Sequence, residues 1–206
     1  MDRALKRLPR HVGIIPDGNR RWAQGRGRAK GDGYEAGIAP GLRMLRFCRE
    51  LGIEELSVYG FTKENVRRPS DQVHAFSAAC VALACRAVEE GAALRVIGDT
   101  RSPVFPRELL SFAQARTPGA PRLNLLANYG WQWDVAGLPR GLRSADASRV
   151  DLVVRWGGRR RLSGFLPIQC AYADFYVIDT LWPDMREEEL VDALVWYESQ
   201  DVTLGG

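Results

Sequence analysis

The sequence has no long apolar run, few cysteines and histidines, and very little lysine. No stretch of about eighteen apolar residues occurs, so no transmembrane helix and no stable membrane insertion are expected. The N-terminal residues lack the apolar segment of a secretory signal peptide. We therefore expect a cytoplasmic protein.

The cysteines and histidines argue against a metal site built from these residues. None of the four cysteines belongs to a CxxC pair, and each lies in an apolar stretch: Cys48, Cys80, Cys85 and Cys170. This pattern predicts free, buried thiols in a reducing compartment. The two histidines, His11 and His74, have no cysteine at the spacing of a zinc site.

Lysine is rare because arginine supplies most of the positive charge. Of 29 basic residues only Lys6, Lys30 and Lys63 are lysines, and the formal net charge is +4. Genomic codon bias is one explanation; the other is that arginine forks grip phosphate oxygens two at a time. No basic tract alternates with aromatic residues as in nucleic-acid motifs, so we expect no nucleic-acid partner.

The apolar pattern predicts one α/β domain spanning residues 1–206. Short apolar runs predict six strands at 12–15, 55–61, 94–97, 123–127, 152–155 and 175–178. Helical spacing predicts helices at 34–51, with Pro40 delaying its start or kinking it, and at 70–90 and 186–199. This alternation favours a mostly parallel central sheet flanked by helices. Ligands bind beyond the carboxyl ends of such strands, so the charged turns there should converge.

The turn after the first predicted strand has the residues of a diphosphate site. Gly18 permits close backbone approach, and Arg20 and Arg21 offer charge-assisted hydrogen bonds to phosphate. Asp17 would repel phosphate on its own, so an acid here indicates a bridging Mg²⁺, which binds carboxylates together with substrate phosphate. The alternative is an ordinary helix cap with a solvated arginine pair.

Two further charged segments follow the second and fifth predicted strands, at 61–69 and 155–163. The second holds four arginines in seven residues around Gly157-Gly158, and these would repel one another without an anion. Solvated connecting loops are the alternative for both segments. Asp174 lies among aromatic residues and is costly to bury unpaired, so we expect it to pair with arginine or a metal.

Five blocks of the chain, in order, resemble the cis-prenyltransferase family, which includes undecaprenyl diphosphate synthase-like enzymes. The blocks are His11–Trp22, Leu56–Pro69, Leu94–Gly98, Leu123–Gly130 and Asp151–Met185. The resemblance implies the family's α/β fold around a hydrophobic tunnel and a homodimer. It also implies Mg²⁺ as cofactor and allylic and homoallylic isoprenoid diphosphates as substrates.

The resemblance also implies roles for individual residues. Asp17 matches the magnesium aspartate, and Asp174 stands where the family has a metal-contacting glutamate. Asn19, Glu64 and Asn65 match catalytic positions, Asn19 near the proton lost on condensation. Gly18 and Arg21 match the allylic diphosphate loop, Trp22 matches too, and Arg68 matches a conserved arginine. Substrate binding is also expected for Arg20, from its charge, and for Lys30 and Tyr34, which stand at the edge of the allylic phosphate site. Binding of the second diphosphate is implied for Arg155, Arg161 and Ser163.

Several positions depart from the family pattern. Tyr34 replaces a histidine, Lys30 an arginine and Val66 a tryptophan. In the block for the second diphosphate, a Thr, a Glu and an Asn are replaced by Trp156, Arg159 and Gly164. The segment between residues 98 and 151 is shorter than in long-chain synthases. These departures favour a short product, with a branched or cyclised skeleton as an alternative to a regular one.

The expected activity is that of a short-chain isoprenyl diphosphate synthase. Ionisation of dimethylallyl or geranyl diphosphate, assisted by Mg²⁺, is followed by condensation with a second isoprenoid diphosphate. One rival is a terpene synthase on the same fold, which cyclises the cation of a single prenyl diphosphate or adds water to it. A non-catalytic partner subunit is disfavoured, because such subunits typically lose the metal aspartate and this chain retains Asp17, Asn19 and Glu64.

Overall fold

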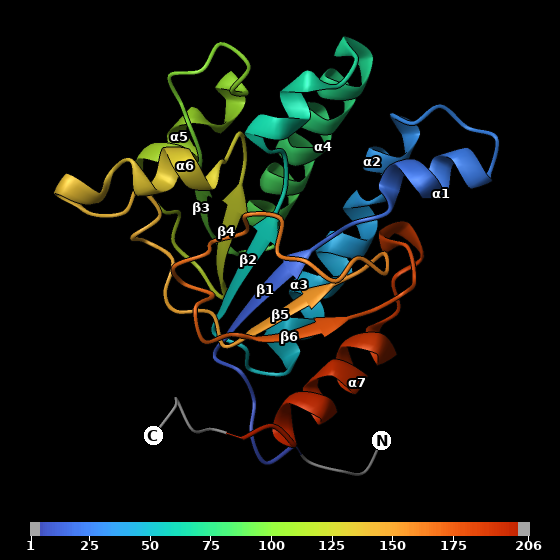
Figure 1. Cartoon of the computed structure of the whole chain (residues 1–206), viewed down its shortest axis with the longest axis vertical. Coiled ribbons are helices and arrows are strands. Elements are labelled where there is room, and N and C mark those ends of the chain that lie inside the picture. Colours follow the sequence, from blue (N-terminus) through green and yellow to red (C-terminus); the bar gives the residue numbers. More distant parts are fainter. Residues whose placement is uncertain (1–4, 202–206) are drawn as a thin grey trace.

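The centre of this computed structural model is a six-stranded parallel sheet in the order β3-β4-β2-β1-β5-β6 (Figure 1). The structure describes residues 5–201. The strands are β1 (His11–Ile15), β2 (Glu55–Tyr59), β3 (Ala93–Ile97), β4 (Arg122–Leu126), β5 (Leu152–Arg155) and β6 (Asp174–Val177). Each predicted strand is present, and the predicted α/β class is confirmed.

Helices connect and cover the strands. They are α1 (Asn19–Gly25), α2 (Asp32–Ala36), α3 (Ile38–Glu50), α4 (Ser70–Glu89), α5 (Leu110–Gln114), α6 (Trp131–Val135) and α7 (Glu187–Glu198). Short 3-10 turns lie at η1 (Lys63–Arg67), η2 (Arg107–Leu109), η3 (Leu138–Arg140) and η4 (Trp182–Asp184). The helix predicted at 34–51 is two helices, α2 and α3. Pro40 lies in the first turn of α3, where its missing N–H costs little, as the late-start alternative required.

Alternate residues of the strands build one apolar layer on each face of the sheet. Val12 and Ile14 point to the face packed by α3, α4 and α7, while Ile15 and Tyr59 pack against Phe165 on the other face. All five residues of β1 are buried, as expected for a parallel strand covered on both sides.

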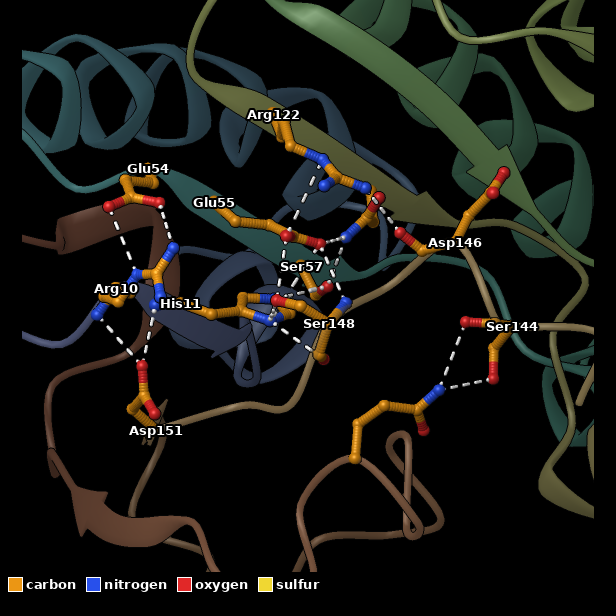
Figure 2. Close-up of polar contacts among 12 residues, drawn as sticks. Arg10, His11, Glu54, Glu55, Ser57, Arg122, Ser144, Asp146, Ser148 and Asp151 are labelled. Atoms are coloured by element: carbon orange, nitrogen blue, oxygen red, sulfur yellow. Dashed lines mark hydrogen bonds and ion pairs between the residues drawn. The ribbon is translucent and has the colours of Figure 1, made fainter.

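A buried polar cluster occupies the amino-terminal half of the sheet (Figure 2). Here His11 Nε2 lies 2.9 Å from Ser57 Oγ, and Asn124 Nδ2 donates to Glu55 Oε1 at 2.6 Å and to Ser57 Oγ at 3.0 Å. The Ser148 hydroxyl donates to Glu55 Oε2 at 2.9 Å. The polar atoms of this cluster thus satisfy one another inside the protein.

Burial and pairing shift the titration of the two ionisable groups in this cluster. Burial lowers the pKa of His11, against the opposing attraction of Glu55. Burial acts to raise the pKa of Glu55, but His11 and the hydrogen bonds from Asn124 and Ser148 bring that pKa below its usual value.

The cysteines follow the prediction at three positions of four. Cys48, Cys80 and Cys170 are buried, and burial raises the pKa of Cys80 and of Cys170 to about 12. Cys85 is exposed, because it lies on the outer side of α4 and not on its core side, so the expected burial is wrong there. Within residues 5–201, no helix combines the length and apolarity needed to cross a bilayer.

Candidate functional site

A polar cavity of about 550 Å³, here called the diphosphate cavity, lies at the carboxyl ends of β1, β2 and β5. The three charged segments meet around it, as the parallel-sheet rule required. All the predicted site residues except Trp22 and Asp174 line it: Asp17, Gly18, Asn19, Arg20, Arg21, Lys30, Tyr34, Glu64, Asn65, Arg68, Arg155, Arg161 and Ser163.

The turn from β1 into α1 places Asp17 on the cavity wall. Gly18 has φ +107°, a conformation that side-chain-bearing residues rarely adopt, and its N–H donates to Asp17 Oδ1 at 2.6 Å. The cap position of α1 is Gly18, which offers no side-chain acceptor. Asp17 is therefore not an ordinary helix cap, and its side chain remains one-third exposed toward the cavity.

Arg155, the last residue of β5, joins the first and third charged segments. Its Nη2 lies 2.8 Å from Asp17 Oδ2, and its Nη1 donates to Ser163 Oγ at 2.9 Å and to the carbonyl of Arg161. Ser163 has φ +54°, which is uncommon for a residue with a side chain. The Tyr59 hydroxyl donates to the Ser163 carbonyl at 2.8 Å and so helps to hold this conformation.

Two buried polar atoms of the cavity have no partner. Among residues 5–201, four buried side-chain atoms lack a hydrogen bond, and two of them are Arg155 Nε and Asn19 Oδ1. A buried donor without an acceptor costs about 1–3 kcal/mol. Arg155, which lines the cavity, therefore has an N–H that lacks an acceptor.

The second charged segment contributes η1 and Arg68. The Asn65 side chain accepts from the Thr62 N–H at 3.0 Å and so fixes the start of η1, while Glu64 lines the cavity. Arg68 Nη1 donates to the Tyr34 hydroxyl at 2.6 Å. Burial lowers the pKa of Arg68 and raises that of Tyr34.

A small apolar cavity of about 40 Å³ adjoins the diphosphate cavity beneath Asn19. Residues of α2, α3, α4 and β2 form its walls, and Trp182 closes one side. The site therefore has a small apolar cavity beside a basic, polar one.

Two predicted residues lie away from the diphosphate cavity. Asp174 is level with Leu152 at the amino end of the sheet, whereas Asp17 follows the carboxyl end of β1, so one chain does not bring the two carboxylates together. Burial also raises the pKa of Asp174. The Trp22 indole N–H donates to Asp184 Oδ1 at 2.7 Å, and its ring lies under Arg26, which ties α1 to η4.

Sequence reasoning missed Tyr59, Thr62, Gln24 and Phe76 as lining residues. Tyr59 and Phe76 were indistinguishable from core residues by pattern. Conversely, Trp156 in the second-diphosphate block is fully buried and donates to Glu189 Oε2 at 3.0 Å, so this departure changes the core beneath the site.

A parallel sheet with a basic cavity beside a small apolar one fits the class of proteins that bind ligands with an anionic head and an apolar tail. The prenyltransferase family model described as "Putative undecaprenyl diphosphate synthase" matches residues 15–141 and 137–205. The chain belongs to this family.

Relatives and a solved structure support that membership. The chain is 34% identical to an isoprenyl transferase of Heliobacterium mobile, over 97% of this chain and 88% of the relative. It is also 34% identical to the ditrans,polycis-undecaprenyl-diphosphate synthase of Escherichia coli (strain K12), over 96% and 90%. The structure resembles lavandulyl diphosphate synthase from Lavandula x intermedia in complex with dimethylallyl diphosphate. That match has a TM-score of 0.80 and 25% identity, over 96% of this chain and 98% of the other. The chain is therefore a prenyltransferase.

Proposed function

We propose that this chain is a short-chain isoprenyl diphosphate synthase that ionises an allylic diphosphate and joins the cation to a second isoprenoid diphosphate. The observation that carries the proposal is the meeting of two arginine groups over Asp17. Arg20, Arg21 and Arg68 come from the first and second charged segments, and Arg155 and Arg161 from the third. Arg21 Nη2 donates to the Gly157 carbonyl at 2.7 Å, so the two groups meet at the cavity. Each group matches one diphosphate of a two-substrate reaction.

The residues around Asp17 fit a magnesium ion that is shared with substrate. Within residues 5–201, no three His, Cys, Asp or Glu side chains lie close enough to form a metal cage. Mg²⁺ often binds one or two carboxylates together with substrate phosphates, and Asp17 faces the cavity as such a ligand. When bound, the ion neutralises charge on the departing diphosphate. A cation at Asp17 must share its carboxylate with Arg155 or displace that guanidinium.

Residues that line the cavity can be assigned to each step of the condensation. The bond between the allylic C1 and the diphosphate oxygen breaks while Arg20 and Arg21 stabilise the leaving group. The double bond of the second substrate, held by Arg155, Arg161 and Ser163, attacks C1, and a proton leaves the adjoining carbon. Asn19 lines both the polar and the apolar cavity, so it is positioned beside the reacting carbons.

The size of the apolar cavity supports a short product. Its volume is about 40 Å³, which is small beside the length of a polyprenyl chain. The likeness to lavandulyl diphosphate synthase supports dimethylallyl diphosphate as a substrate and a branched product as one outcome. We also propose a homodimer, supported by family membership.

The decisive experiment is incubation with dimethylallyl, geranyl and farnesyl diphosphates, with and without isopentenyl diphosphate and Mg²⁺. Elongation that requires isopentenyl diphosphate establishes regular condensation, and a diphosphate product from dimethylallyl diphosphate alone establishes irregular condensation. A hydrocarbon or alcohol without diphosphate would replace the proposal with a terpene synthase. Absence of product under every condition would contradict both.

Neighbouring arginines provide a matched test of the second diphosphate site. Arg161 lines the diphosphate cavity, whereas the exposed Arg160 does not. Arg161→Gln should raise the KM of the second substrate about tenfold or more, while Arg160→Gln should leave it nearly unchanged. Equal effects of the two changes would show that general positive charge, and not a specific contact, holds this substrate.

A further inference from the structure

The diphosphate cavity and the apolar cavity share one short boundary. Five residues line both: Pro16, Asn19, Tyr34, Gly60 and Phe76. Only Tyr34 and Phe76 have large side chains, so these two rings form most of the boundary between the two cavities.

The two rings form a fixed pair. Tyr34 from α2 stacks on Phe76 from α4 with ring centroids 4.3 Å apart and planes within 4°. Phe61 packs edge-on against Phe76 at 5.8 Å. Arg68 donates to the Tyr34 hydroxyl, and its guanidinium lies 5.7 Å from the Phe76 ring centroid. The pair is thus contacted by Phe61 on the core side and by Arg68 on the side of the diphosphate cavity.

The apolar space beyond the pair is small, about 40 Å³. Small residues, Gly37, Gly41 and Ala79, line the apolar cavity, but Leu83 and Trp182 separate it from a deeper void of about 10 Å³. Leu83 lies 3.0 Å from where a Cβ on Gly41 would be, so it fills the space that this glycine leaves. A long allylic tail must therefore move Phe76 or remain in the polar cavity.

We propose that the Tyr34–Phe76 pair is the specificity-determining element that restricts the allylic substrate to a dimethylallyl tail. This inference rests on the proposed function and names its substrate. A longer tail would have to break the ring stack before reaching apolar surface. Removal of the Phe76 ring joins the two cavities and gives a longer tail an apolar path.

Binding of unreactive analogues tests the proposal without turnover. Dimethylallyl and farnesyl S-thiolodiphosphates are titrated calorimetrically into the wild type, Phe76→Ala and Phe76→Leu. The ratio of the farnesyl Kd to the dimethylallyl Kd should fall at least tenfold in Phe76→Ala and by a smaller factor in Phe76→Leu. Val81→Ala, a truncation on the same helix outside both cavities, should leave the ratio unchanged.

The Tyr34 hydroxyl provides the discriminating control. Tyr34→Phe keeps the ring but removes the hydrogen bond from Arg68, so the ratio should stay within about threefold of the wild type. A ratio that is unchanged in both folded Phe76 variants, or shifted as much by Tyr34→Phe as by Phe76→Ala, overturns the proposal. If the wild type binds neither analogue, the proposed function itself fails. If it binds the dimethylallyl analogue and the ratio does not respond, only the role of the pair fails.

Discussion

The two halves of the central sheet both hold polar side chains, but their polar groups are satisfied in different ways. At the amino-terminal half, His11, Glu55, Ser57 and Asn124 are almost fully buried, and they hydrogen-bond to one another and to Ser148 (Figure 2). At the carboxyl ends, Asp17 remains partly exposed, and Arg155 Nε and Asn19 Oδ1 have no partner. A closed network stabilises the fold, whereas an open one leaves bonding capacity for a ligand.

Asp17→Ala should have the largest effect, and it should impair only the site at the carboxyl ends of the strands. Loss of the metal-binding carboxylate is expected to lower kcat about a thousandfold or more, on the order of 4 kcal/mol of barrier. The partly exposed position of Asp17 means that the protein should still fold. Steady-state kinetics and circular dichroism together check this prediction. A fully active, folded variant would exclude the proposed mechanism.

Glu55→Ala should disrupt the buried polar cluster at the amino-terminal half of the sheet. The change removes one acceptor from the Asn124 amide and one from the Ser148 hydroxyl, and it removes the charge beside His11. We expect a loss of about 3 kcal/mol in the free energy of unfolding, with kcat per folded molecule unchanged. Urea denaturation and kinetics at saturating substrate check the two halves of this prediction. A drop in kcat without a loss of stability would contradict it.

The pH dependence of the free energy of unfolding should reveal the contribution of the buried polar cluster. Because burial lowers the pKa of His11 below its ordinary 6.5, the unfolded chain binds a proton at a pH where the folded chain does not. Stability present above pH 6.5 is therefore lost on acidification, by up to about 1.4 kcal/mol per pH unit until the folded pKa is reached. Urea denaturation between pH 7.5 and 5.5 measures the slope.

The two histidines offer the matched control. His11→Asn should flatten this slope, while His74→Asn, at an exposed position, should not. Below about pH 4.5 the lowered pKa of Glu55 acts in the same direction, because its carboxylate stabilises the fold only while ionised. An identical slope in all three proteins would remove His11 from the explanation.

Glu54→Gln should have the smallest effect, although Glu54 neighbours Glu55 in the chain. Its bond to Arg10 joins two exposed side chains and is screened by solvent. We expect unfolding midpoints indistinguishable from the wild type in urea. A loss comparable to that of Glu55→Ala would show that burial is not what separates the two positions.

The parallel-sheet rule accounts for most of what could be predicted from sequence. It placed Asp17 and Arg155 together because both follow or end strands. The same rule puts Asp174, at the start of a strand, at the opposite end of the sheet within one chain, so a contact between Asp174 and the metal stays a prediction from the resemblance. Tyr59 and Phe76 could not be assigned, because apolar periodicity does not distinguish a ring that faces a cavity from one that faces the core.

The register of β1 and β5 has a consequence for how this site tolerates change. Ile15 pairs with Arg155 in the sheet, so the separation of Asp17 from Arg155 is fixed by backbone hydrogen bonds two residues away. The loops that carry the other arginines can vary in length without altering that separation. The sheet therefore fixes the distance between the two halves of the site. Sequence variation in the loops can change which substrates enter without moving Asp17 relative to Arg155.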